Sequence, residues 1–249
     1  MSLSLEAWLA VAAVFMLAGA VKGVVGMGLP TVSMGLLGLF MLPPQAAALL
    51  VIPSLLTNLW QMWNGPELAA LLRRFALLLA LLFVGTLLGV RLLTHPGAIW
   101  PQLMLGGVLA LYGLLGLGLP NLTLPVGWER RTAPWVGFST GFLTGATGVA
   151  VVPLAPYASA LNLQREALVQ FLGLSFTVST LGLGLGLSAE GHYPASLALT
   201  SLALLLPTVL GMVLGQRLRR RIAAAPFRRA FFVAMVLLGF AIVGRALAR

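Results

Sequence analysis

One lysine lies inside an apolar segment of the sequence, and it is the residue best suited to bind a charged ligand. Lys22 is followed by the glycine-rich stretch Gly23-Val24-Val25-Gly26-Met27-Gly28 and by Thr31. An ammonium, hydroxyls and the unpaired N–H groups of a broken helix are hydrogen-bond donors, which favour an oxyanion over a metal cation. The alternative is that the first helix ends here and Lys22 reaches to a membrane interface.

Other polar side chains lie near this stretch and near a second glycine-rich stretch, residues 145–148. Together with glycines of the two stretches they form the predicted binding set. The predicted substrate-binding residues are Lys22, Gly26, Gly28, Thr31, Ser54, Thr57, Asn58, Thr144, Thr147, Gly148, Gln170 and Ser175. The alternative for each Ser or Thr is a hydrogen bond to its own helix or to a neighbouring one.

The composition argues against catalysis. Cys and Asp are absent, and all five Glu residues map to ends or loops, so thiolate, paired-carboxylate and metal chemistry are not expected and no cofactor is predicted. Gly137-Phe138-Ser139-Thr140-Gly141 looks superficially like a nucleophile elbow, but it lacks the strand-turn-helix context. His95 and His192 fall in short connectors, so no His is placed to activate Ser139. We expect no enzyme.

The elements that must position these residues are membrane helices. The chain is 60% hydrophobic and 8% charged, whereas a soluble domain is about 25% charged. The predicted class is all-α, a polytopic membrane protein with 8–10 hydrophobic helical segments and broken or re-entrant glycine-rich helices. The predicted segments are 5–21, 24–42, 45–63, 75–93, 102–119, 135–147, 149–161, 167–187, 194–216 and 231–248. Residues 7–21 lack a preceding basic region, so we expect them to be retained and not cleaved as a signal peptide.

The two halves of the chain repeat a motif. Gly19-x-x-x-Gly23-x-x-Gly26 recurs 122 residues later as Gly141-x-x-x-Gly145-x-x-Gly148, and the pair Gly85 and Gly89 recurs as Gly211 and Gly215. We expect a first membrane repeat at 1–122, a connector at 123–131 and a second repeat at 132–249. Gly-xxx-Gly pairs pack helices within one chain or between chains, so a homo-oligomer is possible.

The net charge of +10 gives the orientation of the repeats. Arginines lie at the ends of apolar stretches, which indicates cytoplasmic loops and not a nucleic-acid partner. If the chain folds back near residues 22–28, eleven arginines lie inside and three outside; if 5–42 crosses once, the counts are eight and six. The folded-back arrangement makes the repeats inverted. Its inside arginines are Arg73, Arg74, Arg130, Arg131, Arg165, Arg217, Arg219, Arg220, Arg221, Arg228 and Arg229, and its outside arginines are Arg91, Arg245 and Arg249.

The doubled glycine-rich segment ending in proline, at residues 23–30 and 145–153, resembles that of the sulfite exporter TauE/SafE family of bacterial membrane proteins. The turns at 43–46 and 165–167 are similar too. The resemblance implies a multi-pass protein of the bacterial inner membrane that exports sulfite, sulfoacetate or a related organosulfonate through a midplane site between the repeats. Its partners are then the small anion and the lipid bilayer. The alternatives are a non-transporting membrane scaffold or a carrier of a different small solute.

Anion export needs no coupled ion. Each negative charge that leaves a negative cytoplasm gains about 2.3 kcal/mol per 100 mV. We therefore expect uniport, with proton coupling through Lys22 or passage of HSO₃⁻ as the alternatives.

Overall fold

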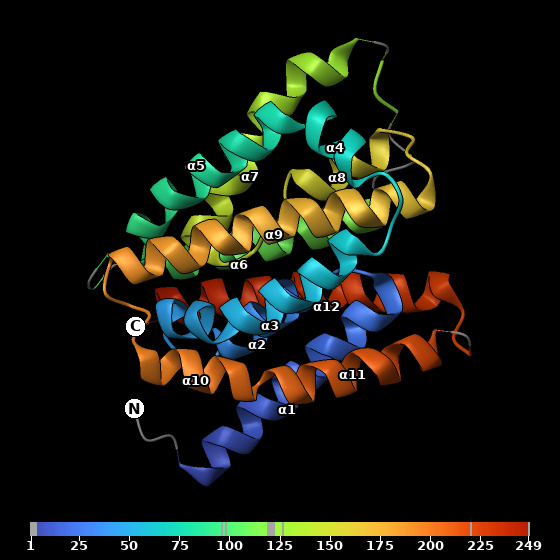
Figure 1. Ribbon diagram of the computed structural model, residues 1–249. Helices are drawn as coiled ribbons and strands as arrows, with labels where there is room; N and C mark the ends of the chain where they lie inside the picture. The colour runs from blue at the N-terminus through green and yellow to red at the C-terminus, as the bar shows by residue number, and fades with distance from the viewer. Residues whose placement is uncertain are drawn as a thin grey trace.

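The computed structural model describes residues 4–95, 97, 99–118, 123–125, 127–219 and 221–248. Within these residues the chain forms twelve α-helices and no strand (Figure 1). The helices are α1 (Leu5–Val25), α2 (Leu29–Leu37), α3 (Pro43–Trp63), α4 (Leu68–Arg74), α5 (Ala76–Leu93), α6 (Trp100–Gly118), α7 (Trp128–Thr147), α8 (Leu154–Ala160), α9 (Arg165–Ala189), α10 (Ala195–Ala203), α11 (Leu205–Leu218) and α12 (Ala224–Leu247). The repeat boundary predicted at residue 122, and Arg220 and Arg249 of the charge count, lie outside the described residues.

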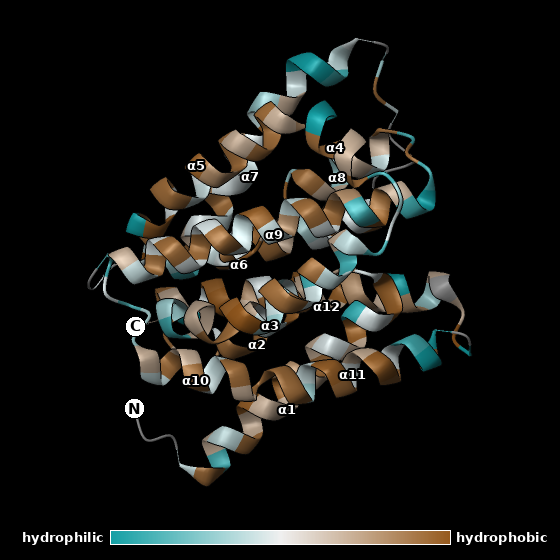
Figure 2. Cartoon of the chain, in the orientation of Figure 1, coloured by the Kyte–Doolittle hydropathy of each residue, from teal (hydrophilic) through white to brown (hydrophobic). Residues whose placement is uncertain are grey.

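Seven of the described segments are long and apolar enough to cross a membrane. They are α1, α3, α5, α6, α9, the consecutive pair α10 and α11, and most of α12. Figure 2 shows apolar brown along these ribbons and hydrophilic teal at helix ends, including the ends of α5 and α11. The prediction of an all-helical, polytopic membrane protein is confirmed.

Several predicted helix boundaries were wrong. Helix α1 continues to Val25, four residues beyond its predicted end, and α7 begins at Trp128, inside the stretch predicted as a connector. Glu129 in the first turn of α7 favours this early start, because an acid stabilises the positive end of a helix. The predicted segment 194–216 is two helices that meet at Leu204. The helix is interrupted there because Pro207 has no N–H to donate to the carbonyl of Ala203.

The helix predicted at 149–161 is also shorter than expected. Residues 148–153 are not helical, and α8 begins only at Leu154. Gly148 and the β-branched residues Val149, Val151 and Val152 are weak helix formers, which explains the later start. In the first half, the predicted segment 24–42 is likewise too long, since α2 spans only Leu29–Leu37, with Pro30 in its first turn.

Glycines interlock the two halves of the chain. A Cβ on Gly145 of α7 would lie 2.1 Å from the Thr86 carbonyl oxygen of α5, and a Cβ on Gly215 of α11 would lie 2.0 Å from the Ala20 carbonyl oxygen of α1. Backbones approach this closely only where side chains are missing. The Gly-xxx-Gly pairs therefore pack helices within one chain, with α1 on α11 and α5 on α7.

Helices α3 and α9, which occupy corresponding places in the two predicted halves, run in opposite directions. In Figure 1, α3 runs from left to right and α9 from right to left. Arg74 pairs with Glu129 at the start of α7, whereas Arg91 and Glu190 approach within 3.8 Å at the ends of α5 and α9. These two ion pairs mark opposite ends of the bundle and agree with the folded-back arrangement.

Helices α2 and α8 are too short to cross a bilayer alone. Their nine and seven residues correspond to about 13 and 10 Å at 1.5 Å per residue, against a hydrocarbon thickness of about 30 Å. Each follows a full-length helix and a glycine break, so each half begins with a long helix and a half-helix.

Candidate functional site

Lys22 is buried in the last turn of α1 and its side chain reaches α3. The residue is 5% exposed. Its Nζ donates to Thr57 Oγ1 at 2.9 Å and to Asn58 Oδ1. Thr57 in turn donates its hydroxyl to the Pro53 carbonyl at 2.7 Å, which leaves its oxygen lone pairs free to accept from Lys22. The structure thus brings Lys22 together with Thr57 and Asn58 of the predicted set, which lie 35 and 36 residues after it in the sequence.

The charge of Lys22 has no acidic partner among the described residues. The two ion pairs found there join Arg74 to Glu129 and Arg91 to Glu190. An ammonium has three N–H donors, and the described contacts of Lys22 use two of them. The Asn58 Nδ2 group is also buried and has no hydrogen-bond partner in the described part of the chain. Lys22 therefore has one unused N–H group and Asn58 Nδ2 has two, on side chains that contact each other.

Three hydroxyls of the predicted set are buried without a described hydrogen-bond partner. They belong to Thr31 of α2, Ser54 of α3 and Ser175 of α9. Ser54 lies one helical turn before Asn58, on the same face of α3. Buried polar groups are normally paired, so unpaired hydroxyls near a break are candidate ligand contacts.

The predicted glycines form the breaks themselves. Gly26 and Gly28 have φ values of 87° and 108°, and Gly148 has a φ of 74°. In both halves the residue after the long helix closes its last turn, since Gly26 N donates to the Lys22 carbonyl and Gly148 N to the Thr144 carbonyl. A Cβ added to Gly26 would have no atom within 4 Å beyond the adjoining residues and its own helix. A Cβ added to Gly148 would lie 3.0 Å from Met34 Sδ of α2. The breaks therefore differ, because the first has space beside it.

The predicted threonines of the second half bond locally. Thr144 donates to the Thr140 carbonyl, and Thr147 donates to the Leu143 carbonyl, both at 2.6 Å. Thr147 also accepts from Val149 N at 3.2 Å and so stabilises the break after α7. Both hydroxyls therefore bond within their own helix and its C-terminal end, which is the alternative to substrate binding given for them above.

Gln170 joins α9 to the end of α3 and the turn that follows. Its Nε2 donates to the carbonyls of Met62 and Gly65, both at 2.8 Å, and its Oε1 accepts from Glu67 N at 2.9 Å. The amide is thus fully engaged with backbone. Gln170 forms no described hydrogen bond with Lys22, Thr57 or Asn58, the three residues that form the Lys22 cluster.

Ser201 of α10 forms hydrogen bonds with the backbone of α3 and is absent from the predicted set. Pro53 lacks the N–H that would bond the Leu49 carbonyl, and Ser201 Oγ donates to that carbonyl at 2.8 Å. Ser201 Oγ also accepts from Ile52 N at 3.1 Å. The signal in the sequence is the proline inside an apolar helix, because its orphaned carbonyl needs a donor from elsewhere.

No group of three or more His, Cys, Asp or Glu residues that could hold a metal ion occurs in the described ranges. A family model described as "Sulfite exporter TauE/SafE" matches residues 11–242 of the chain. No curated protein and no solved structure matches it.

Proposed function

Because the chain belongs to the sulfite exporter TauE/SafE family, a family of membrane transporters and not of enzymes, we propose that it exports or facilitates the passage of a small oxyanion. The proposed substrates are sulfite, sulfoacetate or a related organosulfonate. The proposed location is the bacterial inner membrane, which the chain crosses several times.

The unsatisfied donors at Lys22 are the observation that carries this proposal. A buried ammonium without an acidic partner is costly in apolar surroundings. An oxyanion at this point supplies the missing charge and accepts from both Lys22 Nζ and Asn58 Nδ2. The unpaired hydroxyls of Thr31 and Ser54 are the further contacts we assign to the substrate.

The proposed route lies between two repeats, 1–122 and 132–249, joined by the connector 123–131. Its support is the reciprocal packing of α1 on α11 and of α5 on α7, each joining one half to the other. The half-helices α2 and α8 come next to the breaks in both halves. Movement of one helix pair relative to the other is the proposed way to open the site to either side.

Anion binding to the purified protein tests the proposal. We expect sulfite or sulfoacetate to raise the melting temperature in detergent more than chloride does at equal ionic strength, because a ligand stabilises the state it binds. Lys22→Gln keeps a polar side chain but removes the charge, and we expect it to abolish the selective increase.

Thr94→Val is the matched control, since Thr94 is a buried residue that donates to the Val90 carbonyl of its own helix at 3.0 Å. It should keep the anion response. No selective response to any oxyanion in the parent protein would favour a scaffold or a carrier of another solute. A response that Lys22→Gln retains would place the anion elsewhere.

A further inference from the structure

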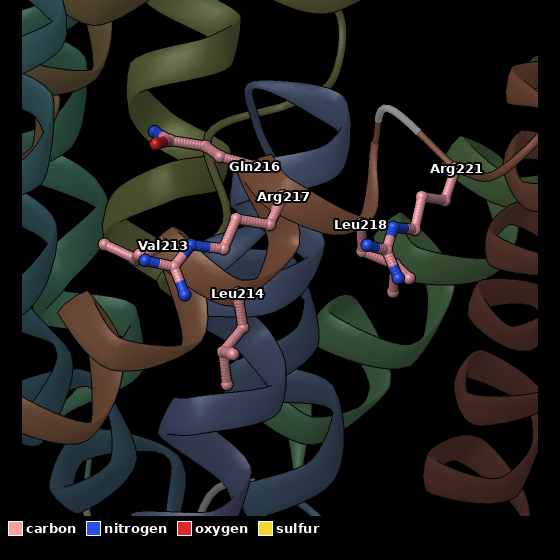
Figure 3. Close-up of a pocket in the computed structure, with 6 residues that line it drawn as sticks. All are labelled: Val213, Leu214, Gln216, Arg217, Leu218 and Arg221. Atoms are coloured by element: carbon pink, nitrogen blue, oxygen red, sulfur yellow. The ribbon is translucent and has the colours of Figure 1, made fainter.

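A cavity of about 660 Å³, open to the surface, lies beside the C-terminal end of α11, where the backbone of Gln216 packs against Gly23 of α1. Three of its lining residues are polar and three are apolar. They are Gln216, Arg217, Arg221, Val213, Leu214 and Leu218. In Figure 3 the guanidinium of Arg217 lies beside Val213, and that of Arg221 lies beside Leu218. The volume falls in the usual range for ligand sites, roughly 300–1,000 Å³.

The positive charge of this cavity is not balanced by the chain. No glutamate lines it, and neither Arg217 nor Arg221 forms an ion pair within the described residues. By contrast, Arg74 and Arg91 each approach a glutamate. Arginine presents a planar set of donors that matches a phosphate group. The polar side of the cavity therefore suits an anionic phosphate.

The apolar side of the cavity faces away from the protein interior. Gly211 and Gly215 form the face of α11 that packs on α1, and Leu214 and Leu218 lie elsewhere on the helix, 53% and 45% exposed. Arg217 follows Leu214 by three residues, which places the two on one side of the helix, and Arg221 lies three residues beyond the end of α11 and also lines the cavity. A ligand here contacts exposed leucines on a membrane-spanning helix and arginines at its end.

The end of α11 belongs to the arginine-rich side of the molecule, the side that the distribution of positive charge assigns to the cytoplasm. Basic pockets at this level of membrane proteins bind the headgroups of acidic lipids. We propose that the cavity binds one anionic phospholipid of the cytoplasmic leaflet, with its phosphate on Arg217 and Arg221 and an acyl chain along Leu214 and Leu218.

Lipid-dependent stabilisation tests this site. The purified protein in a non-ionic detergent is titrated with dioleoyl-phosphatidylglycerol, with dioleoyl-phosphatidylcholine and with inorganic phosphate. We expect phosphatidylglycerol alone to raise the melting temperature, by roughly 3–6 °C at ten times its Kd. The paired substitution Arg217→Gln with Arg221→Gln should remove most of this increase, and each single substitution should remove part of it.

The matched control is Arg228→Gln with Arg229→Gln, which removes two exposed arginines near the start of α12 that do not line the cavity. This variant should respond to phosphatidylglycerol as the parent protein does. Equal loss in both pairs would mean a general charge effect and would overturn the site, as would a full response after loss of Arg217 and Arg221. An equal response to inorganic phosphate would assign the cavity to a soluble anion, and an equal response to phosphatidylcholine would leave the arginines without a role.

Discussion

The two polar atoms of the Asn58 amide differ in their environment, so at the scale of one residue the contact that supports the fold can be separated from the contact proposed for the substrate. Its Oδ1 accepts from Lys22, while its Nδ2 is buried without a described partner. If the oxyanion supplies that partner, then a group at position 58 that neutralises Lys22 competes directly with the substrate. The side chain can thus be changed so that the fold is kept and the anion is excluded.

Asn58→Asp makes this change with almost no change in shape. The introduced carboxylate pairs with the Lys22 ammonium and repels an oxyanion, so we expect at least a tenfold loss of anion affinity, which corresponds to about 1.4 kcal/mol. The melting temperature without anion should stay the same or rise, because the charge of Lys22 gains a partner. Isothermal titration and thermal unfolding measure the two quantities.

Asn58→Leu is the comparison variant, since it removes both polar atoms and adds no charge. It should weaken binding and also lower the melting temperature. Unchanged anion affinity in Asn58→Asp would contradict the assignment of this cluster to the substrate.

At the scale of elements, α3 carries the Lys22 partners on a helix that is interrupted by Pro53. The carbonyl of Leu49 loses its helical donor there and receives the Ser201 hydroxyl. Thr57 bonds to the Pro53 carbonyl itself, one turn further on. The contact from α10 therefore supports the part of α3 that presents Thr57 and Asn58.

Ser201→Ala leaves a buried carbonyl unpaired and should destabilise the protein by about 1–3 kcal/mol. Pro53→Ala restores the N–H that bonds Leu49, so Ser201→Ala should cost less than half as much in that background. A double-mutant cycle of thermal or denaturant unfolding measures this coupling. Equal costs in both backgrounds would show that Ser201 does not compensate for Pro53.

The glycine contacts between α5 and α7 predict a second effect on stability. Gly145→Ala places a methyl group 2.1 Å from the Thr86 carbonyl oxygen, so the helices must separate and we expect a loss of about 1–3 kcal/mol or more. Gly107→Ala of α6 is the control, because no other atom lies within 4 Å of its Cβ position. It should leave the melting temperature unchanged or raise it. Similar effects of the two substitutions would contradict the packing of α7 on α5.

The sequence predicted those elements and residues whose signal is local. A single lysine in an apolar segment, followed by glycines, singled out Lys22 and the first break, and the polar side chains on the next predicted segment singled out Thr57 and Asn58. Gln170 and Ser201 could not be assigned in this way, because their roles depend on backbone atoms 105 and 152 residues away, in Gly65 and Leu49. The late start of α8 was missed because an apolar stretch of valines has the composition of a membrane helix.

At the scale of the whole molecule, the inverted arrangement predicted for the two halves would place most arginines at one end. Arg74 and Glu129 join α4 to α7 at that end, and Arg91 and Glu190 meet at the other. The connectors 64–67 and 161–164 and residues 219 and 221–223 then lie on one side, and residues 94, 95, 97, 99 and 190–194 lie on the opposite side. The distribution of positive charge assigns the first side to the cytoplasm.

Single cysteines test this orientation, and the chain has no native cysteine to remove. His192→Cys lies on the predicted outer side and Arg131→Cys on the cytoplasmic side, both at exposed positions. In spheroplasts, a membrane-impermeant maleimide should label His192→Cys at once and Arg131→Cys only after lysis. The reverse pattern would invert the proposed orientation, and early labelling of both would contradict the inverted arrangement of the halves.

Charge movement through reconstituted protein tests the central claim most directly. Proteoliposomes with an imposed membrane potential are given sulfite, sulfoacetate, sulfate or chloride, and the current is recorded for the parent protein, Lys22→Gln and Asn58→Asp. We predict a saturable current for a sulfur oxyanion that needs no pH gradient and is lost in both variants. Flux that depends on a pH gradient with the voltage clamped would contradict uniport, and the absence of flux for every anion would contradict the proposed transport itself.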